Sequence, residues 1–217
     1  MNQHFDLVCI GSGPAGQRAA VQASKLGKRV AIIEKRRIVG GMCLESGTIP
    51  SKTFREAVLA FSGMANRFVP GQGFPVGPRP TGGELLSRVS HVVQKETEVM
   101  ESQLRRNDVV VFRGEASFQD RHTVMVQSEN QSQQLTADYI LIAVGTVPSV
   151  PSGLIVDGTI VLTSDSLLDL KRIPKTLAVI GAGVIGVEYA SMFAALGVEV
   201  ILIDKRERPL EFLDREI

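Results

Sequence analysis

The chain has 217 residues, of which 44% are hydrophobic and 22% charged, and its formal net charge is +1. This balance is typical of a soluble globular protein with one large or two small domains. The small net charge, the few aromatic residues and the absence of Trp argue against a nucleic-acid partner. No apolar run is long enough for a membrane span, and MNQHFDLV lacks the regions of a signal peptide. With only Cys9 and Cys43, no disulfide framework is expected, and the sequence predicts a cytoplasmic protein without a membrane partner.

The first part of the chain predicts a strand–helix–strand unit followed by a turn and a helix. Residues 5–10 form a short apolar run typical of a strand, and residues 14–26 have helical spacing that stops at Gly27. Residues 29–34 form a second apolar run, which predicts a strand buried on both faces. Segment 39–61 begins with a glycine turn and has helical spacing in its second half.

The middle of the chain predicts a long helix and several short strands. Residues 62–83 are rich in Gly and Pro and are expected to form a surface loop. Residues 84–106 carry an apolar stripe at helical spacing, which predicts an amphipathic helix. Short strands are expected at residues 109–112, 123–127 and 134–136, and a further buried strand at residues 139–144.

The last part of the chain predicts a second strand–helix–strand unit. A proline-punctuated stretch marks a domain boundary, so the expected domains are residues 1–148 and 149–217. Strands at residues 176–180 and 199–203 flank a helix at residues 183–196. Two parallel strands and one helix leave a sheet uncovered, so we expect the chain to be truncated at its C-terminal end. The alternative is that a partner chain completes the sheet.

Each strand–helix–strand unit contains a glycine fingerprint. In GSGPAG, Gly11 permits a tight turn, Gly13 lets the backbone approach a pyrophosphate, and Gly16 lets the helix pack closely on the strand. The helix N-terminus supplies oriented N–H groups that suit a phosphate. Glu34 lies 18 residues after Gly16, at a strand end, where its carboxylate can accept hydrogen bonds from ribose hydroxyls. The alternative is an ordinary glycine turn with a solvated Glu.

The second fingerprint is GAGVIG at residues 181–186, followed by Asp204 at the same spacing. An acid at this position favours the free 2′-hydroxyl of NAD(H). Lys205 and Arg206 could nevertheless receive a 2′-phosphate if Asp204 turns away, so the choice between NAD and NADP stays open. Two dinucleotides on one chain point to electron or hydride transfer between them.

Together these segments resemble the pyridine nucleotide–disulfide oxidoreductases. GSGPAG, Glu34 and GGMCLESGTIPSK resemble the FAD-binding half of that family, and GAGVIGVEYA resembles its NAD(P) fingerprint. TADYILIAVGTVP resembles the family's hinge, with Val144 where the family has Thr. The resemblance implies an α/β, three-layer Rossmann-like fold with a parallel sheet, helices and a small antiparallel β-meander. It also implies FAD as cofactor, nicotinamide nucleotides, NAD(H) and NADP(H), as substrates, and a parent that dimerises through a C-terminal region missing here.

One position departs from the family. Its redox pair is Cys-x-x-x-x-Cys, whereas this chain has Cys43 and Thr48, and a Thr hydroxyl cannot form a disulfide. Cys9 lies in the first strand and is expected to be inert core. The remaining route is hydride entry from one nicotinamide and exit to another through the flavin, and the GTIPSK variant resembles the soluble pyridine nucleotide transhydrogenases of that family. The alternatives are a dihydrolipoamide-dehydrogenase-like reductase and a catalytically inert dinucleotide-binding fragment.

The resemblance also implies roles for single residues. Lys52 is expected at the flavin N5 edge, where a cation stabilises reduced flavin, Glu188 is expected to pair with it, and Cys43 is expected beneath the ring. The three His residues have no metal spacing, and no metal is expected. The expected cofactor-binding residues are Gly11, Gly13, Pro14, Ala15, Gly16, Glu34, Lys35, Gly40, Gly41, Met42, Cys43, Ser51, Lys52, Ala116, Ala143, Gly145, Gly181, Gly183, Val184, Ile185, Gly186, Glu188, Asp204 and Lys205.

Overall fold

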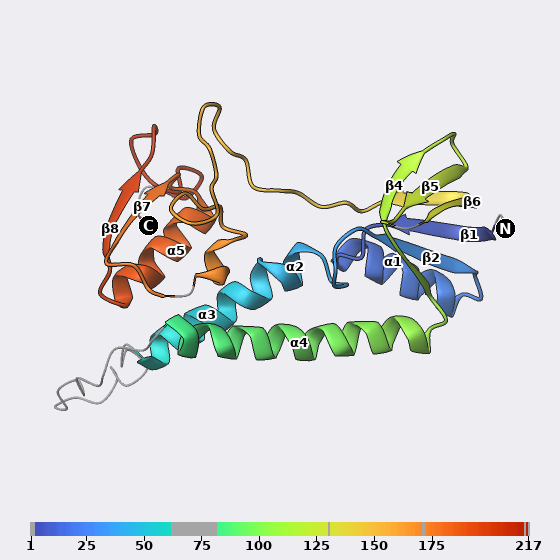
Figure 1. Ribbon diagram of the computed structural model, residues 1–217, viewed down its shortest axis with the longest axis horizontal. Helices are drawn as coiled ribbons and strands as arrows, with labels where there is room; N and C mark the ends of the chain where they lie inside the picture. Colours follow the sequence, from blue (N-terminus) through green and yellow to red (C-terminus); the bar gives the residue numbers. More distant parts are fainter. Residues whose placement is uncertain (1–2, 62–81, 130, 171, 215, 217) are drawn as a thin grey trace. The chain divides into compact units, whose positions relative to one another are not determined.

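The computed structural model describes residues 3–61, 82–129, 131–170, 172–214 and 216 (Figure 1). The chain divides into two compact units, the first formed by Met1–Pro50 and His91–Leu154 and the second by Ser51–Ser90 and Ile155–Ile217. Most of the loop expected at 62–83 lies outside the described residues. Among the described helices, none has both the length and the apolar character to cross a membrane.

A six-stranded sheet forms the first unit, in the order β3-β2-β1-β6-β5-β4. The strands are β1 (Gln3–Ile10), β2 (Val30–Glu34), β3 (Val110–Arg113), β4 (Glu115–Phe118), β5 (Thr123–Gln127) and β6 (Ser132–Ile142). β1 pairs in parallel with β2 and β6, and β2 pairs in parallel with β3. β5 pairs antiparallel with β4 and β6, so a meander continues the parallel sheet.

The two central parallel strands, β1 and β2, are covered on both faces. On one face, Cys9 and Ile32 pack with residues of α1 (Pro14–Lys25) and with Leu104 near the end of α4 (Gly82–Arg106). On the other face, Val8 packs with Val126 and its neighbours in the meander, and β4 contacts β2 directly. Helices, parallel sheet and meander make three layers, which confirms the expected fold class. They also explain why β2 is buried along its whole length.

Two strand predictions in the first unit are wrong. The strands expected at 134–136 and 139–144 are one strand, β6, and the second half is not buried: Tyr139 is 74% and Ile142 64% exposed. The reason is that β5 pairs only with residues 132–136 of β6, so the meander does not extend over its second half. β4 was not expected, because most of its EASF residues are exposed and give no apolar run.

The second unit contains the other strand–helix–strand motif. β7 (Thr176–Ile180) pairs in parallel with β8 (Glu199–Ile203), and α5 (Val184–Ala195) connects them, as the sequence predicts. The remaining helical elements among the described residues are α2 (Met42–Glu45), α3 (Thr48–Phe61) and the short 3₁₀ helix η2 (Leu167–Asp169). Within this unit, Phe54 of α3 packs against Tyr189 and Phe193 of α5, with ring centroids 6.5 and 5.8 Å apart. The domain boundary after residue 148 stays a prediction.

Candidate functional site

The first glycine turn connects β1 to α1 and is fixed by close backbone packing. Gly11 has φ of +103°, and a Cβ on it would lie 2.3 Å from the Ala143 carbonyl oxygen. A Cβ on Gly16 would lie 2.0 Å from the Gly11 carbonyl oxygen. Because real Cβ atoms do not approach backbone so closely, these two glycines are required by the packing of the protein itself.

Gly13 differs from these two glycines. A Cβ at Gly13 would meet no protein atom within 4 Å, and Gly13 lines an open cleft. It is the N-cap of α1, so the N–H groups of the first turn of α1 begin beside this cleft. The space left by the missing side chain is therefore available to a ligand, and anionic groups are favoured there.

Glu34 forms the second wall of this site and is 5% exposed. Its Oε2 accepts hydrogen bonds from the Ser12 amide at 2.9 Å and the Ser12 hydroxyl at 2.5 Å, and its Oε1 accepts the Arg36 amide at 2.8 Å. The Ser12 oxygen in turn accepts the Gly40 amide at 3.0 Å. A carboxylate offers about four acceptor positions, so these three donors leave capacity for a ligand hydroxyl.

The cleft has a volume of about 480 Å³. This lies within the range of about 300–1,000 Å³ that is usual for small-molecule sites. Five segments line it, at residues 10–15, 33–36, 41–43, 114–116 and 143–147. The expected site residues that line it are Gly11, Gly13, Pro14, Ala15, Glu34, Lys35, Gly41, Met42, Cys43, Ala116, Ala143 and Gly145.

Other expected residues lie outside the lining of this cleft. Gly16 packs behind the turn, the Gly40 amide donates to the Ser12 hydroxyl, and Ser51 and Lys52 belong to α3. The lining also includes residues outside the expected set, among them Ser12, Gly114 and Glu115. Ser12 had a weak signal, because it occupies the variable position between the first two fingerprint glycines.

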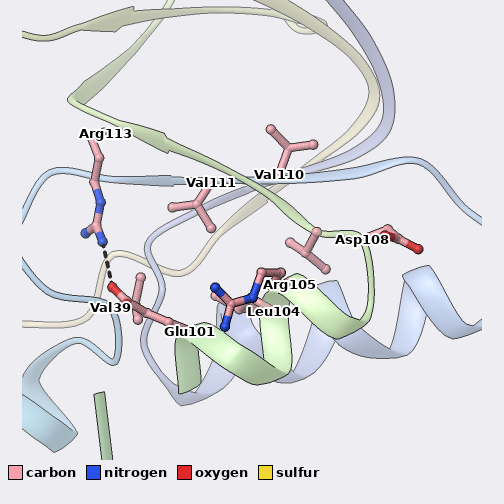
Figure 2. A pocket seen from close by; sticks show the side chains of 9 residues that line it. Val39, Glu101, Leu104, Arg105, Asp108, Val110, Val111 and Arg113 are labelled. Carbon is pink, nitrogen blue, oxygen red and sulfur yellow. Dashed lines mark hydrogen bonds and ion pairs between the residues drawn. The ribbon is translucent and has the colours of Figure 1, made fainter. Parts of the chain in front are cut away.

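A second hollow of the first unit lies between α4 and the edge strand β3 (Figure 2). Its volume is about 570 Å³, and its apolar lining includes Val39, Leu104 and Val111. At one side Arg113 pairs with Glu101 at 3.3 Å, as the dashed line in Figure 2 shows. None of the expected site residues is among its lining residues, so the cleft at Gly13 is the better candidate.

The second fingerprint repeats the first arrangement. Gly181 has φ of +108°, and a Cβ on Gly186 would lie 1.9 Å from the Gly181 carbonyl oxygen. A Cβ on Gly183, like one on Gly13, would meet nothing within 4 Å. Asp204 Oδ2 accepts the Ala182 amide at 2.6 Å, and its Oδ1 accepts the backbone N–H two residues further on at 2.8 Å.

The acid of this second site carries an additional partner. The Arg206 guanidinium forks onto Asp204, with Nε to Oδ1 at 2.8 Å and Nη2 to Oδ2 at 2.7 Å. These bonds, together with the backbone N–H donors, hold the pKa of Asp204 well below its usual range. Lys205, Val184 and Ile185 are exposed, and Glu188 is half-buried on α5.

The expected catalytic residues are placed as follows. Cys43 is half-buried in the wall of the first cleft, and Thr48 is the first residue of α3. Cys9 is buried in the core, and burial raises its pKa to about 11. Lys52 is exposed, and in the described part of the chain no ion pair joins it to Glu188, so the expected pair is not formed. The described residues contain no group of His, Cys, Asp and Glu that could hold a metal ion.

Comparisons with known proteins show which family model and which proteins this chain is similar to. Residues 5–217 match the family model described as pyridine nucleotide-disulphide oxidoreductase. The soluble pyridine nucleotide transhydrogenase of Mycobacterium tuberculosis is 50% identical over 217 residues, which are 99% of this chain and 46% of that protein. The protein of the same name from Photobacterium profundum is 42% identical over 221 residues, again 46% of its length.

Solved structures of a flavoprotein disulfide reductase are also similar to this chain. A copper(II) complex of a cysteine-to-serine mutant of the HOCl-induced flavoprotein disulfide reductase RclA from Escherichia coli is similar with a TM-score of 0.85 and 30% identity. RclA without the mutation matches with a TM-score of 0.80 and 30% identity. These matches cover 100% and 98% of this chain and 46% and 45% of those chains. The chain therefore spans about half the length of the relatives it matches.

Proposed function

Because the chain belongs to the pyridine nucleotide-disulphide oxidoreductase family, we propose that it is part of a flavoprotein that transfers hydride between the NADH and NADPH pools through FAD. The observation that carries the proposal is the repeated architecture. Each of the two glycine fingerprints lies in its own strand–turn–helix–strand unit, and the two units have the same architecture. In each unit, a carboxylate at the end of the second strand accepts hydrogen bonds from backbone N–H groups. Two such units on one chain fit two dinucleotides.

The first cleft fits the adenosine and diphosphate parts of FAD. The open space at Gly13 and the N-terminus of α1 suit the diphosphate, and the remaining acceptor positions of Glu34 suit ribose hydroxyls. Gly41 has φ of +61° and places its Cα against the turn, since a Cβ on it would lie 2.8 Å from the Gly13 Cα. Bound flavin supplies the two-electron chemistry, because it can accept a hydride and give it up again.

Within this proposal the reaction uses no redox-active disulfide. Cys43 lines the cleft, and the position five residues later is Thr48, whose hydroxyl cannot replace a thiol. The other cysteine, Cys9, is buried and free. This arrangement supports hydride transfer between nicotinamides over electron transfer to a disulfide substrate.

Several further assignments belong to the same proposal. Residues 1–148 are assigned to FAD binding and residues 149–217 to NAD(P) binding. Lys52 is assigned to hold positive charge at the reduced flavin and Glu188 to the nicotinamide end. The parent protein is proposed to be a cytoplasmic homodimer.

The visible spectrum of the purified protein tests the proposed function. Flavin absorption that bleaches anaerobically on addition of NADH and returns on addition of thio-NADP⁺ is the expected result. Bleaching that requires dihydrolipoamide, with no return on addition of thio-NADP⁺, would instead support a dihydrolipoamide-dehydrogenase-like reductase. A folded protein that binds no flavin would overturn the proposal in favour of an inert nucleotide-binding protein.

A further inference from the structure

We infer that Arg206 is the specificity switch of the second nucleotide site. When NADPH binds, the Arg206 side chain releases Asp204 and binds the 2′-phosphate. When NADH binds, Asp204 accepts a hydrogen bond from the 2′-hydroxyl. This inference rests on the proposed function, since that function requires one chain to use both nucleotides. It is carried by the hydrogen bonds around Asp204 and by their difference from those around Glu34.

Asp204 is fixed in place by the backbone. Its two oxygens accept the amides of Ala182 at 2.6 Å and Arg206 at 2.8 Å, and neither bond depends on the Arg206 side chain. Its side chain is 11% exposed, whereas that of Arg206 is 35% exposed. The carboxylate is therefore the fixed partner and the guanidinium the movable one, which is the reverse of a mechanism in which Asp204 turns away.

The first site shows that the fork is not a general property of the fingerprint. There the acid Glu34 accepts the hydroxyl of Ser12, and Arg36, two residues after the acid, directs its side chain to Glu45. In the second site Ala182 stands in the place of Ser12 and offers no hydroxyl. The side chain of Arg206 takes over that role with two hydrogen bonds of its own.

The fork saturates the carboxylate. Asp204 has four donors, which are the two backbone amides and the Nε and Nη2 groups of Arg206. Because a carboxylate offers about four acceptor positions, a ribose hydroxyl can bind only after at least one guanidinium bond is released. Binding of NADH is therefore expected to displace Arg206 from at least one oxygen of Asp204.

The guanidinium released from Asp204 is suited to bind the 2′-phosphate of NADPH. A planar guanidinium forms bidentate bonds to carboxylate and to phosphate alike, so Arg206 can exchange one for the other. A 2′-phosphate placed near Asp204 without a cation would be repelled by its charge. Arg206 removes that repulsion, and the exposed Lys205 adds a second, less directional positive charge.

Binding measurements on variants of the whole protein test this switch. The ligands are 2′,5′-ADP, which carries the 2′-phosphate, and 5′-AMP, which lacks it, each titrated by calorimetry. Arg206→Ala is expected to weaken 2′,5′-ADP at least about tenfold and to leave 5′-AMP unchanged or tighter, since charge-assisted bonds are lost only for the phosphate. Arg206→Lys is expected to fall between wild type and Arg206→Ala for 2′,5′-ADP, because a lysine keeps the charge and loses the fork.

Arg208→Ala is the matched control. It removes an equal charge two residues away, and the Arg208 guanidinium donates to the Glu211 carbonyl rather than to Asp204, so both affinities are expected to stay at wild-type values. Far-UV circular dichroism and melting curves establish that each variant is folded. If Arg206→Ala lowers the affinities for both ligands equally, or lowers neither affinity, the switch is wrong.

The outcome separates the switch from the proposed function. If thio-NADP⁺ reoxidises the NADH-reduced flavin while Arg206→Ala keeps its preference between the two ligands, the function stands and the switch is wrong. If no hydride transfer occurs while Arg206→Ala selectively loses 2′,5′-ADP, the switch stands and the function is wrong. Wild-type protein that binds neither ligand overturns the switch directly.

Discussion

At the scale of single residues, Ser12 connects three parts of the first site. Its hydroxyl donates to Glu34 at 2.5 Å and accepts the Gly40 amide at 3.0 Å, and both partners are buried. One side chain thus joins the glycine turn, the end of β2 and the turn before α2. Loss of a buried hydrogen-bond partner leaves the other group unsatisfied, which is more costly than loss of an exposed bond.

Ser12→Ala tests this connection. It leaves the Gly40 amide without its acceptor and removes one donor from Glu34, so we expect a loss of about 1–3 kcal/mol in stability. Flavin affinity is expected to fall with it, measured by fluorescence titration of the apoprotein alongside thermal unfolding. Ser87→Ala is the control, because the Ser87 hydroxyl bonds the Glu84 carbonyl on an exposed part of α4. Equal behaviour of the two variants would contradict the role assigned to Ser12.

The two cysteines are expected to differ in reactivity. Burial raises the pKa of Cys9 to about 11, so below that pH its sulfur stays a neutral thiol, and the thiolate is the reactive form. Cys43 lies in the wall of the open cleft. Titration of the flavin-free protein with a chromogenic disulfide reagent is expected to modify Cys43 in the native state and Cys9 only after denaturation. A Cys43→Ser variant that still reacts promptly while folded would show this assignment of Cys9 to be wrong.

At the scale of elements, some strands can be predicted from the local sequence pattern, whereas others depend on their tertiary environment. The bounds of β5, β7 and β8 follow from the sequence, because each has an apolar run between clear turns. β4 and the continuity of β6 do not follow, because their residues are largely exposed and their pairing partners lie elsewhere in the chain. Short strands of a meander are specified by pairing more than by their own periodicity.

The packing of α3 on α5 supplies a stability prediction. The Tyr189 side chain is buried against Phe54, and its hydroxyl has no hydrogen-bond partner among the described residues. Burial, with a smaller effect of Glu188, raises the pKa of Tyr189 to about 12, so the ring stays neutral at physiological pH. Tyr189→Phe keeps the ring and removes an unsatisfied polar group, so the free energy of unfolding is expected to stay equal or rise.

Phe193→Ala provides the contrast for this prediction. It removes a buried ring from the same cluster and is expected to lower the free energy of unfolding by about 3–5 kcal/mol. Urea unfolding followed by circular dichroism compares the two variants with wild type. If Tyr189→Phe lowers the free energy of unfolding by more than about 1 kcal/mol, the hydroxyl has a partner in solution and its assignment as unsatisfied is wrong.

At the scale of the whole molecule, the sequence predicted the skeleton of both nucleotide sites and little of their side-chain detail. Gly11, Glu34 and Asp204 follow from the fingerprint, because spacing along a strand–turn–helix–strand unit fixes where they lie. The Ser12 bridge and the Arg206 fork do not follow, since they depend on which of several possible partners a side chain finds in the folded chain. The expected ion pair of Lys52 with Glu188 is not formed among the described residues, and the roles of both residues stay predictions.

The repeated fingerprint also gives a matched pair of variants, Gly13→Val and Gly183→Val. Both glycines have φ in the ordinary region, at −63° and −78°, and a Cβ on either would meet no protein atom within 4 Å. Folding is therefore expected to be unaffected, while the added side chain fills the space intended for a diphosphate. Gly13→Val is expected to fold without flavin. Gly183→Val is expected to bind flavin that NADH no longer reduces.

Gly16→Val and Gly186→Val are controls that are expected to disturb folding itself in the same assay. Their Cβ atoms would lie 2.0 and 1.9 Å from the carbonyl oxygens of Gly11 and Gly181, so both are expected to unfold the unit that carries them. Melting curves separate these variants from the first pair, and anaerobic NADH titration of the flavin spectrum separates Gly13→Val from Gly183→Val. Because each fingerprint is assigned a different nucleotide, normal reduction of Gly183→Val by NADH would rule out the second fingerprint as the nicotinamide site.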